Sequence, residues 1–386
     1  MTTSLFHVIL LMNSLLKICD KAYQDGTTLI ELLITLAIFS VVMAGVYSVY
    51  TIHVHHAIRE YRLAQSEIEI VIARDIIERD IMMAGYGLAD DYSGLIFTPN
   101  PMSLGATDTI APGSTINPVG GTYPTTGLAG ADSLYMMGTA LGIYSKASQG
   151  WTYLKKTSPA EFQIWGDVRE DIQVNDRVIY IEPNTKAIIA EGTAWRFIYP
   201  SAPNFFGNEG RGAILYGLSR PPHGSGSEIP RPYYVVQYRL GGAAADMPKT
   251  CARGTRSLQR VEMTHGESIE PLLACVRDLQ VVFGLDAISP EDGIIDVWDN
   301  GGVLASSYDY QALKRRLKQV RVYILVQNGN RDADYLYVNP DNPANPNGIR
   351  VGDVHLGIGR DITLTAEQRR YRWRLIAFSI TPRNLR

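Results

Sequence analysis

The chain has 386 residues, a formal net charge of −3 at pH 7, 35 glycines and 20 prolines. This length predicts two or three structural units rather than one small domain. Nucleic-acid-binding proteins usually carry a basic patch or a high pI, and the nearly neutral composition gives no sign of a nucleic-acid partner. Three cysteines, Cys19, Cys251 and Cys275, fit no zinc-binding spacing.

The first predicted element is a long apolar helix near the N-terminus. From Thr27 to Ile52 the only charged residue is Glu31, and there is no proline. A helix of this length would extend about 39 Å, which is enough to cross the hydrocarbon core of a bilayer. The run exceeds the ~7–15 apolar residues of a secretory signal. We therefore expect a membrane-spanning helix.

The helical pattern continues beyond the apolar run. Apolar residues recur at helical spacing from Val54 to Ile76, with charged residues between them. In the sequence AGYG at 84–87, Gly85 can adopt the left-handed conformation that ends many helices. We expect one helix from Thr27 to Ala84, whose second half is covered by a sheet on the side of Ile70, Ile77 and Ile81.

Glu31 lies inside the apolar run, where an acidic side chain costs ~2.5–3.5 kcal/mol at a helix centre. One interpretation is that Glu31 lies near the lipid headgroups or is protonated. The other requires a cut after Gly26, which would make Thr27 a new N-terminus. In a bundle of such helices, each Glu31 could pair with the free amine of a neighbour and fix the axial register.

After residue 88 the pattern changes to turn-forming residues and short strand-like runs. We interpret residues 90–130 as a long surface excursion. Val320, Val322, Ile324 and Val326 alternate with other residues and predict a half-buried strand. The predicted strands are 132–138, 176–183, 187–192, 232–240, 257–263, 277–286, 318–328 and 371–380, and a short helix is predicted at 308–317. The fold class is therefore α+β, with a long N-terminal helix on a mostly antiparallel β-rich head with long loops.

The chain contains no recognisable catalytic motif, and we expect no enzyme activity and no required cofactor. Two acidic loops are weak calcium candidates, because oxygen ligands at such spacings suit calcium. The alternative for both is an ordinary hydrated turn. The first loop contains Asp286, Asp292 and Asp296, and the second contains Asn328, Asn330, Asp332 and Asp334.

Cys251 and Cys275 are the two cysteines of the predicted head. In an exported protein a single such pair favours a disulfide. In a cytosolic protein two unrelated buried thiols would be the better interpretation.

The sequence G-TTLIELLITLAIF resembles the class III signal of type IV prepilins. Gly26 matches the cleavage glycine, Thr27 the methylated first residue and Glu31 the register glutamate. Thr27 departs from the usual phenylalanine, and the leader departs from the usual short basic form. Translation from Met12 rather than Met1 would shorten the leader to 15 residues, and the mass of the uncleaved precursor tests this.

The body is similar to PilW-type minor pilins. The block IARDIIERDIMMAGYGL (72–88), the stretch from SLQRVE to DGIIDVW (257–298) and the closing YRWRLIAFSITPRNLR (371–386) carry this resemblance. It is weakest at 90–130 and 200–230, which look like insertions. The resemblance implies a leader at 1–26, a transmembrane half-helix at 27–52, an amphipathic half-helix at 53–88 and a β-rich head at 89–386.

The resemblance also implies a function. A minor pilin is cleaved by a prepilin peptidase, waits in the inner membrane with its head in the periplasm, and then joins the pilus at the cell surface. Its expected partners are other minor pilins, the major pilin, the inner-membrane assembly platform and a large tip adhesin. Such subunits prime assembly and support adhesion, twitching motility or DNA uptake. A minor pseudopilin of a type II secretion system is the alternative, and a membrane-tethered hydrolase is a third, less supported class.

Overall fold

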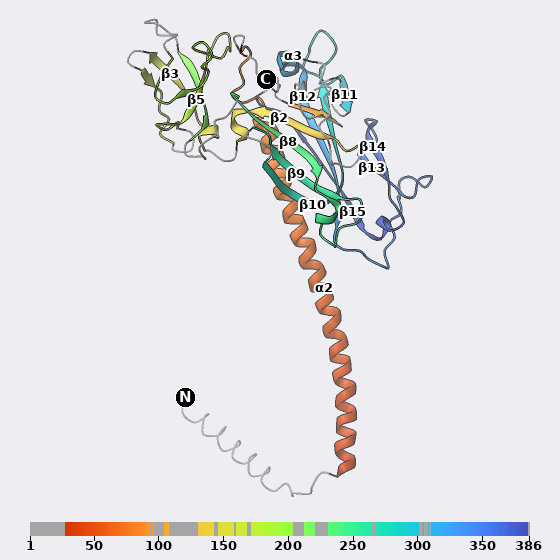
Figure 1. Cartoon of the computed structure of the whole chain (residues 1–386). Helices are drawn as coiled ribbons and strands as arrows, with labels where there is room; N and C mark the ends of the chain where they lie inside the picture. The colour runs from red at the N-terminus through yellow and green to blue at the C-terminus, as the bar shows by residue number, and fades with distance from the viewer. Residues whose placement is uncertain are drawn as a thin grey trace, which may run out of the picture. The chain divides into compact units, whose positions relative to one another are not determined.

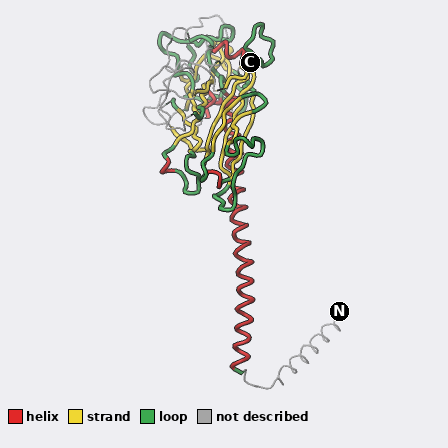
Figure 2. Tube along the Cα trace, turned by 90° about the vertical axis from the view of Figure 1, so that its right-hand side faces the viewer, coloured by secondary structure: helices red, strands yellow, loops and turns green. Residues whose placement is uncertain are grey.

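The fold described here is that of a computed structural model of the chain (Figure 1). The structure describes residues 28–92, 95, 104–107, 130–142, 146–157, 160–167, 171–203, 212–220, 231–264, 268–300, 304, 308 and 310–384. The chain divides into two compact units, the first reaching to Arg62 and the second beginning at Leu63. Strands and their connecting loops make up most of the described part of the second unit (Figure 2).

Helix α2 runs from Leu29 to Met83 and belongs to both units. Its end matches the expectation from the sequence, because Gly85 has a φ of 83°. The carbonyl groups of the last turn, which no helical N–H can reach, are bonded from outside the helix. The Asn384 side chain donates to the Met82 carbonyl at 2.8 Å, and the Tyr86 N–H donates to the Met83 carbonyl at 3.1 Å.

An antiparallel eight-stranded sheet forms the centre of the second unit. Its main path is, in order, β1 (Leu104–Thr107), β2 (Ser133–Gly138), β8 (Tyr234–Gly241), β9 (Arg256–Glu262), β10 (Ser268–Leu285), β12 (Leu317–Asn328) and β15 (Arg372–Ile380). Strand β11 (Val297–Asn300) pairs with β10 outside this path, and the short helix α3 spans Tyr310–Arg316. Strand β1 lies within the predicted surface excursion, so that prediction was wrong for these four residues.

The C-terminal part of α2 packs on one face of this sheet. Ile70, Ile77 and Ile81 are buried in the main hydrophobic core, together with inward-facing residues of β8, β10, β12 and β15. The opposite face carries a second cluster, where Tyr323 and Leu325 of β12 pack against the hairpin β13 (Gly348–Asp353) and β14 (Ile358–Thr363). The central strands are therefore covered on both faces.

This double covering corrects the prediction for β12. Val320, Val322, Ile324 and Val326 face the main core as the alternation indicated, but Tyr323 and Leu325 are also buried. The hairpin that covers their face contains several glycines and short apolar runs, and no strand was predicted for it. The strand is buried on both sides rather than half-buried.

A separate five-stranded antiparallel sheet lies between β2 and β8 in the sequence. Its order is β4 (Ala160–Phe162), β3 (Trp151–Thr157), β7 (Ala213–Ser219), β5 (Arg177–Ile181) and β6 (Phe197–Ile198). Ile179 and Ile181 join the main core, whereas Val178 and Tyr180 pack in a small core of their own. Only β5 of this sheet was predicted. The strand predicted at 187–192 was wrong, because this stretch follows a tight turn at Lys186 and forms isolated bridges rather than a continuous ladder.

Candidate functional site

The first turn of α2 contains the acidic residue that the sequence singled out. The Thr28 N–H donates to Glu31 Oε2 at 3.1 Å, and the Glu31 N–H donates to Thr28 Oγ1 at 3.4 Å. This reciprocal pair is a capping box, which satisfies two of the N–H groups that a helix N-terminus leaves unbonded. Among the described residues, Glu31 Oε1 makes no hydrogen bond, so one carboxylate oxygen is available to an outside donor. Gly26 and Thr27, the predicted processing residues, lie outside the described residues.

The helix that follows Glu31 exposes apolar side chains on every side. Leu29, Val41 and Tyr47 have 78%, 74% and 69% of their surfaces exposed. Within the described residues, the stretch Leu29–Ile58 is long and apolar enough to cross a membrane, and none of it is buried against the protein. Water is a poor solvent for a continuous apolar surface of this kind. Lipid or other apolar helices must therefore cover it.

A buried ionic cluster fixes the C-terminal end of α2 to the sheet, and no sequence pattern predicted it. Arg260 of β9 donates through Nε to Asp80 Oδ2 at 2.7 Å, and the Tyr238 hydroxyl of β8 donates to the same oxygen at 2.8 Å. Arg79 donates to Asp80 Oδ1, so both carboxylate oxygens are bonded. Burial, followed by the charge of Asp80, holds the pKa of Tyr238 well above its usual value. The only sequence signal was the Arg79–Asp80 pair inside the block that resembles PilW-type proteins.

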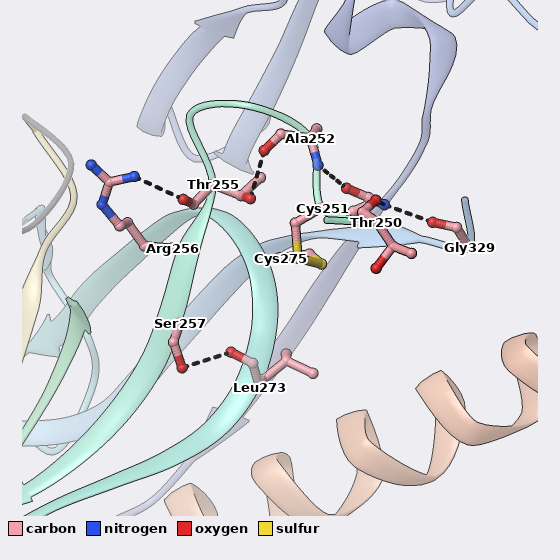
Figure 3. Close-up of a disulfide and its surroundings, with 10 residues drawn as sticks. Thr250, Cys251, Ala252, Thr255, Arg256, Ser257, Leu273, Cys275 and Gly329 are labelled. Atoms are coloured by element: carbon pink, nitrogen blue, oxygen red, sulfur yellow. Dashed lines mark hydrogen bonds between the residues drawn. A yellow bond between two sulfur atoms is a disulfide. The ribbon is translucent and has the colours of Figure 1, made fainter. Parts of the chain in front are cut away.

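Cys251 and Cys275 are joined by a disulfide, with Cα atoms 5.0 Å apart (Figure 3). Cys275 lies in an irregular part of β10 and has a positive φ of 57°. Next to Cys251, the Ala252 N–H donates to Gln327 Oε1 at 2.6 Å, and Gln327 Nε2 donates to the Thr250 carbonyl at 2.8 Å. The bridge and these hydrogen bonds together hold the loop before β9 against β10 and β12.

The first calcium candidate loop uses its carboxylates in local hydrogen bonds. Asp286 Oδ2 accepts from the Gly293 N–H at 2.7 Å, Asp292 Oδ1 from the Ile294 N–H at 2.9 Å and Asp296 Oδ2 from the Ile288 N–H at 2.9 Å. Lys318 Nζ also lies 3.5 Å from Asp286 Oδ2. The three side chains are thus engaged at separate points of the turn.

In the second loop, Asp332 accepts from the Asp334 N–H at 3.1 Å and pairs with Arg372 at 3.4 Å. Asn328 ends β12, and Asn330 lies in the exposed turn that follows. No group of three or more His, Cys, Asp or Glu side chains in the described part of the chain has an arrangement that could hold a metal ion. Calcium binding by either loop was only a weak prediction, and these contacts add no support to it.

Residues 21–47 match the family model of the prokaryotic N-terminal methylation motif. The match covers the expected cleavage glycine, Glu31 and most of the apolar run, and it supports a type IV pilin-like or pseudopilin protein, a class whose members are typically structural. No curated protein and no solved structure matches the chain. The motif and the exposed apolar helix together support anchoring in a membrane.

Proposed function

We propose that the chain is a minor pilin of the PilW type, which primes assembly of a type IV pilus or lies at its tip. The observation that carries this proposal is the methylation motif at residues 21–47, which leads directly into an apolar helix that is not buried and then a β-rich head. The role is structural rather than enzymatic. The subunit contributes a helix to a bundle and presents a head.

The proposed maturation starts with a prepilin peptidase that cuts after Gly26 and methylates the amine of Thr27. The free amine then lies one residue before Thr28, whose N–H already bonds Glu31 Oε2. Glu31 Oε1 is left for the amine of a neighbouring subunit. In a low-dielectric bundle both charges favour this pairing, and the pairing is possible only at one axial offset between the helices.

The chain waits in the inner membrane through Leu29–Ile58, with its head in the periplasm, and moves into the filament when partner helices replace the lipid. The membrane-inserted chain and the chain in the filament bury similar apolar surface, because lipid and helix surfaces are both apolar. The contact that distinguishes the filament is therefore the pairing of Glu31. Other minor pilins, the major pilin, the assembly platform and a tip adhesin are the proposed partners.

The function is tested by deleting the encoding sequence in its host. The proposal expects surface pili to be lost or sharply reduced while secretion of type II substrates continues. Restoring the chain from a plasmid should restore pili, and a chain lacking residues 27–52 should not. If pili persist and secretion stops, the chain is instead a pseudopilin of a type II secretion system.

A further inference from the structure

The five-stranded sheet carries a cleft of about 550 Å³ that the assembly role does not use. Binding sites for small ligands in proteins have volumes in this range. The cleft lies on the side of the small core, since the core residue Ile172 is part of its lining. Its walls include Gln163, Ile164, Asp171, Gln173, Val174 and Tyr199.

The walls of this cleft are held in place by the protein itself. Asp171 accepts the Trp165 N–H through Oδ1 at 2.8 Å and the Gly166 N–H through Oδ2 at 3.0 Å, which fixes the loop after β4. The Tyr199 N–H donates to the Asp176 carbonyl at 2.9 Å. The Tyr199 ring packs on Phe162 with centroids 4.8 Å apart. A site with pre-positioned walls loses little freedom when a ligand binds.

Three neutral polar groups of the cleft have unused hydrogen-bonding capacity. Within the described residues, the side-chain amide of Gln173 and the hydroxyl of Tyr199 make no hydrogen bond. Gln163 donates its Nε2 to the Ile164 carbonyl at 2.8 Å, which leaves its Oε1 as an acceptor. Burial, followed by the charge of Asp171, raises the pKa of Tyr199, so this hydroxyl stays protonated and can donate. Together these groups offer donors and acceptors without formal charge.

Among the described residues that line the cleft, Ile164, Ile172 and Val174 are apolar, and Asp171 carries the only charge. Ile164 and Val174 have 70% and 65% of their surfaces exposed. Lys, Arg and His are absent from the described lining, whereas Asp171 is present, so phosphate and other anions are disfavoured. A purely apolar ligand would leave the amide and the phenol without partners. The best match is a neutral molecule with both hydroxyl groups and apolar C–H faces.

We propose that this cleft binds a neutral saccharide, with its hydroxyl groups bonded to Gln163, Gln173 and Tyr199 and its C–H faces against Ile164, Val174 and the Tyr199 ring. The proposal is independent of filament assembly, because it concerns the head alone. A failure to bind saccharides would therefore leave the proposed assembly role intact, and a failure to assemble would leave the cleft intact.

The test uses the full-length chain purified in a zwitterionic detergent that has no sugar headgroup. A printed array of neutral and sialylated oligosaccharides is the probe, and the strongest neutral oligosaccharide is then titrated by calorimetry. We expect binding of neutral oligosaccharides. Tyr199→Phe and Gln173→Ala should each weaken it about three- to tenfold, as loss of one hydrogen bond does. Tyr153→Phe is the matched control and should bind as the wild type, because Tyr153 points to the other face of β3 from the cleft residue Thr152.

Three results would overturn the proposal: no neutral oligosaccharide binds at millimolar concentration, only sialylated ones bind, or both Tyr199→Phe and Gln173→Ala retain wild-type affinity. Tyr199→Phe keeps the ring and its packing on Phe162. Gln173→Ala removes an amide that no described residue bonds. The thermal unfolding midpoint of each variant, measured alongside, shows which of the two reports on binding alone.

Discussion

Arg260 and Asp80 form a buried ion pair that joins β9 to helix α2, with 2.7 Å between Nε and Oδ2. Each side chain has only 1% of its surface exposed, and the residues are 180 positions apart in the sequence. Tyr238 and Arg79 also donate to Asp80, so both of its carboxylate oxygens are bonded. A contact of this kind determines how the helix is seated on the sheet.

Asp80→Asn should lower the free energy of unfolding by about 3–5 kcal/mol, because the buried Arg260 would lose the carboxylate that it bonds at 2.7 Å and keep only Glu270, at 3.7 Å. Unfolding of the full chain in detergent can be followed by tryptophan fluorescence, since all five tryptophans lie in the head. Glu367→Gln is the matched control. It breaks the Arg331–Glu367 pair, whose side chains are 48% and 56% exposed, and should change stability by at most ~1 kcal/mol. Equal, small effects of both variants would contradict the structural role given to Asp80.

The disulfide between Cys251 and Cys275 closes a loop with a sequence separation of 24. Replacing both cysteines by serine should lower the free energy of unfolding by about 2–4 kcal/mol, because the unfolded chain gains freedom. Mass spectrometry of peptides digested without reductant checks the bond in protein isolated from cells. Two free thiols in that protein would contradict the bridge and the export that it implies.

The stability of the head should decrease as the pH rises from 5 to 8. Burial raises the pKa of Glu262 from 4.5 to about 7, and burial also raises the pKa of Asp278. In this range the folded chain binds more protons than the unfolded chain, so the free energy of unfolding falls with pH. The Glu262 contribution is roughly 3 kcal/mol, present below pH 4.5 and lost as the pH passes 7.

Glu262→Gln should remove most of this slope, because the amide does not titrate. Unfolding midpoints at pH 5, 6, 7 and 8 for the wild type and the variant provide the measurement. A wild-type stability that is flat or rises across this range would contradict the raised pKa values.

The sequence was sufficient to predict the helix and the central strands. The uninterrupted helical spacing from Thr27 and Gly85 at its end placed α2 within two residues at its start and one at its end. Strands β8 and β12 were predicted because each contains several β-branched and aromatic residues close together. The five-stranded sheet was mostly missed, since strands as short as Ala160–Phe162 and Phe197–Ile198 have too few residues to show a period.

Of the functional residues, the sequence predicted only those that neighbouring residues in the chain make recognisable. Glu31 stands out because it is a single charge in an apolar run, and its spacing from Gly26 is fixed along the chain. The partners of Asp80 come from β8 and β9, and no local pattern links residues 158 and 180 positions apart. The cleft residues Gln173 and Tyr199 are likewise brought together only by the folded loops.

Glu31→Ala should reduce incorporation into filaments by at least about tenfold, the ratio that corresponds to ~1.4 kcal/mol, while the protein still inserts in the membrane. The ratio of the chain in sheared pili to the chain in membranes, measured by immunoblot, gives this value. Glu60→Ala is the control, because Glu60 is an exposed acid of the same helix beyond the apolar stretch. Its incorporation should match the wild type. Equal incorporation of Glu31→Ala and wild type would contradict the pairing of Glu31 with the amine of a neighbouring subunit.

Mass spectrometry of the N-terminal peptide from protein isolated from cells tests the central claim most directly. The account predicts a chain that begins at Thr27 and carries one methyl group on its amine. A mature protein that begins upstream of Gly26 would contradict it, because Glu31 would then have no terminal amine to meet.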